Sequence, residues 1–562
     1  GAAAAAASAA AVTDGDDVLA AAPGAFDALY FDGVERAVPN VNCRYSLVDG
    51  ALREEAEVRD VYSPILRTAA SAKEHGGGDA RVKIGVYAYS SQETAEAAVR
   101  AAAAAYDNGR GRWPRMTARE RIEVMERFAD GLHARRERIA EIIMWEICKP
   151  AESAFKEVDR TVEYIRATVA ELKSLENRCN EITSVSGVLA QVKRSPLGVA
   201  LCVAPYNYPL NETFCTAVPA LIMGNTLVLK TPRTGGLCLE PLVELFQSLE
   251  GLPPGVVNII HGSGRTCFPP IMQSGLVNVL AFIGGHRAAS RLHQMHPRPF
   301  SVRLALGLDA NNLAVVTPNA DLDVAAAEVA LGALSFNGQR CTAIKVVFVA
   351  RAVADAFVDK LVARVDAHKL GLPWHDGVQL TPLAEYATKP RVLADMRADA
   401  EKGGATARNA RAAADRSYVF PAVMYPCAPG MTCVDNEQFG PLVPVVPYDS
   451  LEDVQRFVAA SIYGQQASVF TNDHTDLPEL IDFLSHHVTR ININAQCQRG
   501  PDNLPFSGRK CSATGTLSVF DALRVMSIRV AVATKNNATN VQLLQGVLRE
   551  NSSNVLRAEL HI

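Results

Sequence analysis

The sequence predicts an α/β protein with a doubly wound, largely parallel sheet. Apolar runs typical of buried strands occur at residues 198–203, 226–230, 256–260 and 277–283, and each is followed by a segment with helical spacing, such as Leu210 to Met223. In sheets built this way, ligands collect at the carboxyl ends of the strands. We therefore expect functional residues in the loops that follow these runs.

Composition sets limits on the class of protein. The chain has 562 residues, 48% of them hydrophobic, which is enough for several domains with substantial cores. A net charge of −4 gives no reason to expect nucleic acid or an anionic membrane as a partner. No apolar run reaches the roughly 18 residues of a membrane span. The 12 cysteines lack Cys-x-x-Cys pairs, which favours a reducing, cytoplasmic setting over a disulfide framework or a metal site.

One cysteine lies where a nucleophile is expected. Cys341 ends a Gly-containing loop that starts at Ser335, and Arg340 precedes it directly. A neighbouring guanidinium favours the thiolate, which is the nucleophilic form of the side chain. Asn207 follows the run at 198–203, so its amide could donate a hydrogen bond to an oxyanion in the same cleft.

Five motifs support this interpretation and occur in a fixed order. They are Pro-Tyr-Asn-Tyr-Pro at 205–209, Gly-Asn-Thr at 224–226 with Lys230, Asn-Gly-Gln-Arg-Cys-Thr at 337–342, Glu-Gln-Phe-Gly-Pro at 437–441, and Gln-Arg-Gly-Pro-Asp at 498–502 with Pro505-Phe506. Through them, the chain from about Val82 to about Lys535 closely resembles the aldehyde dehydrogenase superfamily. Within it, the chain resembles the non-phosphorylating, NADP-dependent glyceraldehyde-3-phosphate dehydrogenases.

The resemblance implies an aldehyde dehydrogenase-like division of the chain. The expected parts are an N-terminal extension (1–75), a Rossmann-type cofactor-binding domain (76–185 and 197–305), an α/β catalytic domain (306–500), a small β oligomerisation arm (186–196 and 501–535) and a C-terminal extension (536–562). The arm would contain a hairpin at Val188 to Pro196 and a strand near Ser527 to Thr534. We expect a homo-oligomer, either a tetramer or a dimer of dimers.

The remaining segments give local expectations. Apolar spacing predicts two long helices, from Thr117 to Cys148 and from Ser153 to Leu175. The first ten residues are uncharged and acidic residues follow them, unlike a transit peptide, so the cytosol remains the expected location. Residues 536–562 have partly helical apolar spacing. Docking on a neighbouring subunit and a loosely ordered tail are both open for them.

Two cations point to the cofactor. Lys230 closes a strand and Arg233 follows three residues later, where the resembled fold holds the adenosine ribose of a dinucleotide. Relatives that select NAD commonly carry a glutamate at the position of Arg233. An arginine would instead attract a 2′-phosphate, which indicates NADP. The alternative is a pair of solvated surface cations.

The resemblance also assigns other cofactor contacts. Gly284 and Gly285 begin a helix whose N–H groups would receive the pyrophosphate, although the sequence Phe-Ile-Gly-Gly lacks the hydroxyl of the family's Phe-Thr-Gly-Ser. Glu437 matches the glutamate that holds the nicotinamide ribose, and Phe439 matches the aromatic residue beside the ring.

Charge near the nucleophile suggests the substrate. The resemblance implies that Arg160, Tyr208, Arg340 and Arg499 line the substrate tunnel. Guanidinium groups suit the bidentate geometry of phosphate, which points to a small phosphorylated aldehyde.

One departure concerns the catalytic base. The family carries a glutamate in Leu-Glu-Leu-Gly-Gly, whereas residues 304–308 read Leu-Ala-Leu-Gly-Leu, with Ala305 at the glutamate position. Alanine cannot take a proton, and general-base help is worth about 10²–10⁴-fold. Three explanations are open: Asp309 supplies the base, Ala305 is an introduced substitution that traps the thioester, or the chain is an inactive relative. We favour residual or Asp309-assisted activity, because the thiol, the amide and the arginines all persist.

Together these observations predict NADP-dependent oxidation of glyceraldehyde 3-phosphate to 3-phosphoglycerate. Cys341 would attack the aldehyde, Asn207 would stabilise the oxyanion, and water would hydrolyse the thioester. The alternatives are a dehydrogenase for another small aldehyde or semialdehyde, and a catalytically impaired relative with an NADP-binding or assembly role.

Overall fold

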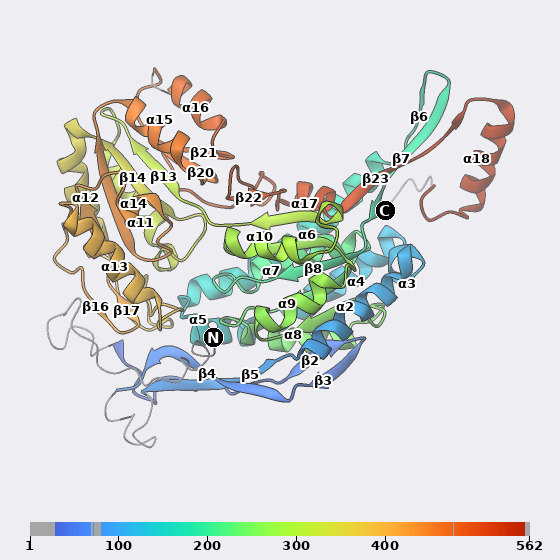
Figure 1. Cartoon of the computed structure of the whole chain (residues 1–562), viewed down its shortest axis with the longest axis horizontal. Coiled ribbons are helices and arrows are strands. Elements are labelled where there is room, and N and C mark those ends of the chain that lie inside the picture. The colour runs from blue at the N-terminus through green and yellow to red at the C-terminus, as the bar shows by residue number, and fades with distance from the viewer. Residues whose placement is uncertain (1–28, 69–70, 72–79, 476, 557–562) are drawn as a thin grey trace.

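The structure is a computed structural model that describes residues 29–68, 71, 80–475 and 477–556. Its two large sheets lie in two halves of the molecule, and a narrow arm projects away from them (Figure 1). The alanine-rich start of the chain and the acidic residues after it lie outside the described residues.

The first large sheet is the predicted doubly wound one. Its order is β22-β12-β11-β8-β9-β10-β2-β3. The parallel strands are β8 (Val199–Val203), β9 (Thr226–Lys230), β10 (Val257–Ile260), β11 (Val277–Ile283) and β12 (Arg303–Gly307). They alternate with helices α7 (Asn211–Ile222), α8 (Glu240–Ser248), α9 (Gly264–Gln273) and α10 (His286–Met295). The prediction of this α/β architecture is confirmed.

Both faces of this sheet are covered, so its strands are apolar throughout. Along β8, Ala200 and Cys202 belong to the core shared with α7, whereas Val199, Leu201 and Val203 belong to the core shared with α9, α10 and α2 (Gln92–Tyr106). Successive side chains of a strand point to opposite faces, which produces this alternation. The carboxyl ends of the strands therefore remain open for a ligand.

Much of the segment set apart as an N-terminal extension is part of the folded body. Strands β2 (Tyr45–Val48) and β3 (Ala51–Glu54) extend the large sheet in antiparallel fashion beyond β10. Strands β1 (Val41–Cys43) and β4 (Glu57–Leu66) flank β5 (Arg81–Tyr89) in a separate sheet. Pairing with β2 satisfies the backbone groups of β10, which would otherwise form an open edge.

The second large sheet has the order β15-β18-β19-β14-β13-β20-β21. Its parallel strands are β13 (Asn312–Val316), β14 (Ile344–Ala350), β18 (Ala422–Tyr425), β19 (Leu442–Tyr448), β20 (Gln466–Phe470) and β21 (Arg490–Ile493), and the antiparallel edge strand is β15 (Thr406–Ala407). Its helices are α11 (Leu322–Leu334), α12 (Ala354–Asp366), α13 (Lys389–Lys402), α14 (Thr432–Asp435), α15 (Leu451–Ala460) and α16 (Leu477–Ser485).

The prediction of one helix from Thr117 to Cys148 is wrong. The segment forms two helices, α4 (Ala118–His133) and α5 (Arg136–Ile147). At the start of α4, the side chains of Thr117 and Glu120 each accept a hydrogen bond from the other residue's backbone N–H. Between the two helices, the N–H of Arg135 bonds to the carbonyl of Leu132 at 3.0 Å, and the backbone of Arg135 leaves the helical region. The second predicted helix is confirmed and longer, as α6 (Ala151–Arg178). Among the described helices, none combines the length and hydropathy needed to cross a membrane.

The predicted hairpin and C-terminal strand form the projecting arm. Strand β7 (Val188–Pro196) pairs with β6 (Ile182–Val185) on one side and with β23 (Ser527–Lys535) on the other. Beyond β23 the chain forms α18 (Ala538–Glu550), which lies near the tip of the arm (Figure 1). The structure leaves both readings of the C-terminal extension open. One further strand of the predicted arm segment, β22 (Ala513–Thr514), instead joins the first large sheet beside β12.

Asn225 joins the arm to the first large sheet. Its fully buried amide donates to the carbonyls of Ala220 and Met526 at 2.9 and 2.8 Å, and its oxygen accepts from the N–H groups of Leu197 and Gly198 at 2.8 and 3.0 Å. The side chain thus connects the end of α7, the start of β8 and the base of β23.

Replacing Asn225 with alanine should therefore destabilise the fold strongly. The change leaves three backbone groups without their partner, namely the N–H groups of Leu197 and Gly198 and the carbonyl of Met526, and each such group costs about 1–3 kcal/mol when it is buried. We expect a large fall in the apparent melting temperature in calorimetry. Asn536→Ala, at an exposed position, is the matched control and should leave it nearly unchanged. Equal melting temperatures for both variants would contradict this role.

Candidate functional site

A cavity of about 1000 Å³ lies at the carboxyl ends of the strands of the first large sheet. All the site residues predicted from the sequence line it. They are Arg160, Asn207, Tyr208, Lys230, Arg233, Gly284, Gly285, Asp309, Arg340, Cys341, Glu437, Phe439 and Arg499. Side chains from both halves of the molecule therefore face one space.

The loop before Cys341 is held in a tight conformation. Phe336, Asn337 and Gly338 all have positive φ, and a Cβ on Gly338 would lie 2.6 Å from the carbonyl oxygen of Gly440. The Asn337 amide donates to the carbonyl of Thr381 and accepts from its N–H at 3.2 Å. These contacts fix the direction in which the sulfur points.

Asn207 lies against this loop. Its Nδ2 donates to the carbonyl of Gln339 at 2.9 Å, which leaves a second amide hydrogen for an oxyanion. Its own carbonyl accepts from Nζ of Lys149 at 2.8 Å. Lys149 also forms a fully buried ion pair with Glu157, and Glu157 accepts from the N–H of Leu210 at 3.0 Å. Neither residue was predicted from the sequence. Glu157 lies on the buried face of α6, where a charged residue was the available signal, whereas Lys149 lies in the connection between α5 and α6.

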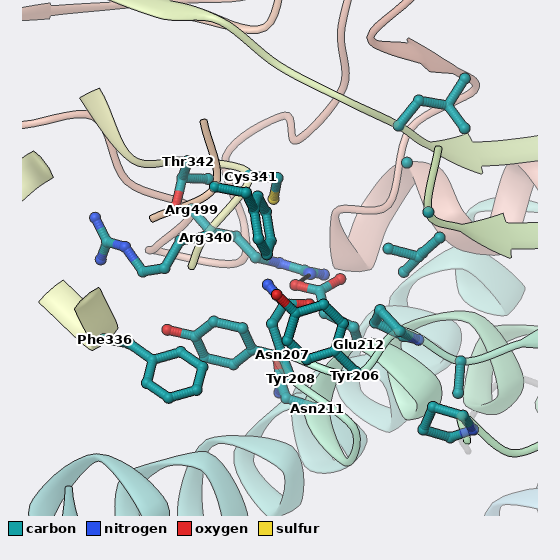
Figure 2. Close-up of a pocket in the computed structure, with 18 of the residues that line it drawn as sticks. Tyr206, Asn207, Tyr208, Asn211, Glu212, Phe336, Arg340, Cys341, Thr342 and Arg499 are labelled. Carbon is teal, nitrogen blue, oxygen red and sulfur yellow. Dashed lines mark ion pairs between the residues drawn. The ribbon is translucent and has the colours of Figure 1, made fainter. Parts of the chain in front are cut away.

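Cys341 is held as a thiol at rest. Burial is the main cause that raises its pKa to about 12, and the charges of Glu212 and Glu437 raise it further, whereas Arg499 and Lys345 oppose them. The expectation that Arg340 makes the thiolate is wrong. Its guanidinium points away from Glu212 in Figure 2, and its Nη2 donates to the carbonyl of Gly332 at 3.2 Å.

The other two arginines of the substrate tunnel are already paired. Arg499 is buried and forms ion pairs with Glu212 and with Asp502, the latter at 3.3 Å. Arg160 binds Asp502 in a bidentate manner, at 2.7 and 3.1 Å. The charges of Arg499 and Arg160 are thus balanced by two carboxylates. Glu212 was missed in the sequence, although it follows the Asn-Tyr-Pro motif by only three residues.

The cofactor side of the cavity suits a nicotinamide dinucleotide with a 2′-phosphate. Lys230 is buried at the end of β9, and the exposed Arg233 lies beside it. Oε1 of Glu437 lies 3.5 Å from Nζ of Lys345 but accepts no hydrogen bond from any described residue, so it is free to receive a ribose hydroxyl. Burial raises the pKa of Glu437 to about 7, and the nearby charge of Lys345 opposes that rise.

Asp309 occupies a different place from the one that a base would need. Its Oδ2 accepts from the N–H of His286 at 2.8 Å and lies 2.6 Å from Nδ1 of the same residue. It therefore caps the N-terminus of α10, where the resemblance places the pyrophosphate. The charge of Asp309 raises the pKa of Glu437 and the pKa of Tyr463. It is not among the main causes that raise the pKa of Cys341.

Ala305 is fully buried in β12, opposite Ala281 of β11. It packs in the hydrophobic core and is not among the residues that line the cavity. Asp309 and Ala305 together leave the position of the family's base without a carboxylate.

Comparisons with known proteins agree with this architecture. Residues 79–530 match the model of the aldehyde dehydrogenase family. The chain therefore belongs to the aldehyde dehydrogenase family.

Two curated relatives and one solved structure are similar to this chain. An NADP-dependent glyceraldehyde-3-phosphate dehydrogenase of Streptococcus equinus is 33% identical over 420 residues, which cover 74% of this chain and 86% of the relative. A 3-sulfolactaldehyde dehydrogenase of Priestia aryabhattai is 26% identical over 404 residues, covering 70% and 82%. The crystal structure of the NADP-dependent glyceraldehyde-3-phosphate dehydrogenase from Bacillus halodurans C-125, complexed with NADP, is 28% identical, with a TM-score of 0.78 over 89% of this chain and 100% of that one.

Lys230 should make recognition of a 2′-phosphate depend on pH. Burial is the main cause that lowers its pKa to about 8, and Arg233 lowers it further. Lys230 is charged below that pH and loses its charge as the pH rises through it. We expect the affinity for NADP, relative to NAD, to fall by about 10- to 150-fold between pH 7 and pH 10, the value of one charge-assisted contact. Dissociation constants from fluorescence titration measure this ratio.

The matched control is Lys230→Arg, because a guanidinium stays charged over this range. In this variant the affinity for NADP relative to NAD should be nearly independent of pH. A wild-type ratio that does not change with pH would remove Lys230 from the 2′-phosphate site.

Asp309→Asn should tighten the binding of NAD and NADP alike. A carboxylate at a helix N-terminus repels a diphosphate at the same place, and such a charge is worth about 0.3–1 kcal/mol, or about 2- to 5-fold in the dissociation constant. Asp321→Asn is the control, since Asp321 caps α11 instead. Weaker or unchanged binding in Asp309→Asn would show that this carboxylate does not face the diphosphate.

Proposed function

We propose that this protein oxidises glyceraldehyde 3-phosphate to 3-phosphoglycerate with NADP. The observation that carries the proposal is Arg340, whose buried Nε has no hydrogen-bond partner among the described residues and whose side chain lines the cavity with Cys341. A desolvated guanidinium with a free donor attracts an anionic group on the substrate. The similarity to NADP-dependent glyceraldehyde-3-phosphate dehydrogenases supports the same substrate.

The residues then divide the chemistry among them. Cys341 loses its thiol proton to solvent as its sulfur attacks the aldehyde carbon, and the amide of Asn207 donates to the resulting oxyanion. The nicotinamide cofactor, when bound, accepts the hydride. Lys230 and Arg233 would hold its 2′-phosphate and Glu437 its ribose. Hydrolysis of the thioester on Cys341 releases the acid.

Two alternatives keep specific support. An aldehyde with a single negative charge, such as a semialdehyde, fits the pairing of Arg499 and Arg160 by internal carboxylates, because that pairing leaves Arg340 as the less compensated cation. A catalytically impaired relative with an NADP-binding or assembly role fits the burial of Ala305.

We also propose that the protein is a homo-oligomer, with a tetramer as the expected form. The arm projects from the folded body (Figure 1) and carries exposed apolar side chains, among them Val185, Ile528 and Val530. A second copy of the chain could cover these side chains through the same arm.

A turnover assay tests the substrate. Wild-type protein should reduce NADP with glyceraldehyde 3-phosphate, and Arg340→Gln should raise the KM for this substrate by about 10- to 150-fold, the value of a charge-assisted contact. The KM for unphosphorylated glyceraldehyde should change far less. Arg549→Gln, on α18, is the control and should change neither. Equal effects on both aldehydes would contradict a phosphate contact, and a wild type that prefers a semialdehyde would favour the first alternative.

A further inference from the structure

Glu212 is a carboxylate in the reaction cavity that the proposed function does not use. It lies in the first turn of α7, is 7% exposed, and lines the same cavity as Cys341 and Asn207. Figure 2 shows its carboxylate beside the Asn207 amide, between that amide and the guanidinium of Arg499. Among the charged groups that change the pKa of Cys341, Glu212 has the largest effect, and it raises that pKa.

The position of Glu212 matters because the other candidates for a base are engaged elsewhere. Ala305 has no ionisable group and lies in the core. Asp309 caps α10 and bonds to His286. Glu437 lies beside Lys345 on the cofactor side, is assigned to the ribose in the proposed function, and has a smaller effect than Glu212 on the pKa of Cys341. Glu212 is thus the carboxylate whose charge acts on the sulfur and that has no role in the proposed function.

Arg499 holds this carboxylate in place. It forms an ion pair with Oε1 of Glu212 and is itself anchored by Asp502 and by the carbonyl of Leu517, each at 3.3 Å. A nucleophile, a base and a third group that orients the base form the recurring arrangement of covalent catalysis. Glu212 and its partner Arg499 line the same cavity as Cys341 and are the candidates for the second and third of these groups.

We propose that Glu212 is the general base for hydrolysis of the acyl-Cys341 thioester, in place of the family glutamate that is alanine at 305. This inference rests on the proposed function for its physiological acyl group, but not for its chemistry. Glu212 takes a proton from water while the water oxygen bonds to the thioester carbon. The oxyanion accepts from Asn207. The carbon–sulfur bond then breaks, the proton passes from Glu212 to sulfur, and the acid leaves after losing its remaining proton to solvent.

An activated ester tests this step without cofactor or aldehyde. p-Nitrophenyl acetate should acylate Cys341 with a burst of p-nitrophenolate, after which hydrolysis of the acyl group sets the steady rate. Glu212→Gln, which preserves shape, should keep the burst and slow the steady phase by about 10²–10⁴-fold, the usual value of a general base. Mass spectrometry should find the acyl group on Cys341 during that phase.

Asp502→Asn is the matched control. It also removes one carboxylate from Arg499, but Asp502 is not among the charges that act on Cys341. We expect its steady phase to slow far less than that of Glu212→Gln. Equal slowing in both variants would show that Glu212 acts only by positioning Arg499, and the proposal would fail.

Titration of the thiol provides an independent readout. Removing the negative charge of Glu212 should lower the pKa of Cys341. Alkylation of Cys341 by iodoacetamide, measured by peptide mass spectrometry, should therefore begin at lower pH in Glu212→Gln than in the wild type. In Asp502→Asn it should begin at the same pH as in the wild type. An unchanged alkylation profile in Glu212→Gln would mean that the carboxylate does not face the sulfur and would overturn the proposal.

A second variant covers the case in which Glu212→Gln folds poorly. Glu212→Ala leaves space beside Arg499 for formate, which should restore part of the steady phase. A folded Glu212→Ala protein that hydrolyses the acyl group as fast as the wild type, without formate, would also overturn the proposal. If the ester results hold but glyceraldehyde 3-phosphate is not oxidised, the proposed substrate fails and the role of Glu212 stands.

Discussion

The geometry of the site depends on the buried ion pair between Lys149 and Glu157. Lys149 holds the carbonyl of Asn207, and Glu157 holds the N–H groups that begin α7, so one pair aligns the oxyanion donor with the helix that carries Glu212. Lys149 also lies over the ring of Tyr208, at 3.5 Å from its centre. Removing one partner of such a pair costs about 3–5 kcal/mol, because a buried charge is left uncompensated. The strand loop and the helix are therefore fixed together.

The charges in the cavity fall into two groups with different tasks. On the cofactor side, Lys230 and Arg233 are cations that no described carboxylate pairs with, which suits an anionic ligand. On the substrate side, Glu212 and Asp502 neutralise Arg499 and Arg160. A fixed, paired network reorganises little when charge develops during a reaction. Because Arg499 and Arg160 are paired in this way, the proposed function assigns the anionic group of the substrate to Arg340.

The sequence predicted the sheet and the residues that line the cavity, because buried parallel strands and loop motifs leave local patterns. It did not predict the charge network. Arg340 adjoins Cys341 in sequence, yet its guanidinium turns toward Gly332, whereas Arg499, far along the chain, acts on the sulfur. Side-chain direction depends on packing that adjacency does not encode. Likewise, the break at Arg135 has no glycine or proline to mark it, and strands β1 to β4 lie outside the recognisable motifs.

The protonated state of Cys341 has a consequence for how fast its sulfur is oxidised. Peroxide attacks the thiolate, and the first step toward sulfenic acid is slow for a buried thiol. A sulfur with a pKa of about 12 carries almost no thiolate at neutral pH. The resting protein thus keeps its nucleophile largely in the thiol form, which reacts with peroxide more slowly than the low-pKa thiols that sense oxidants.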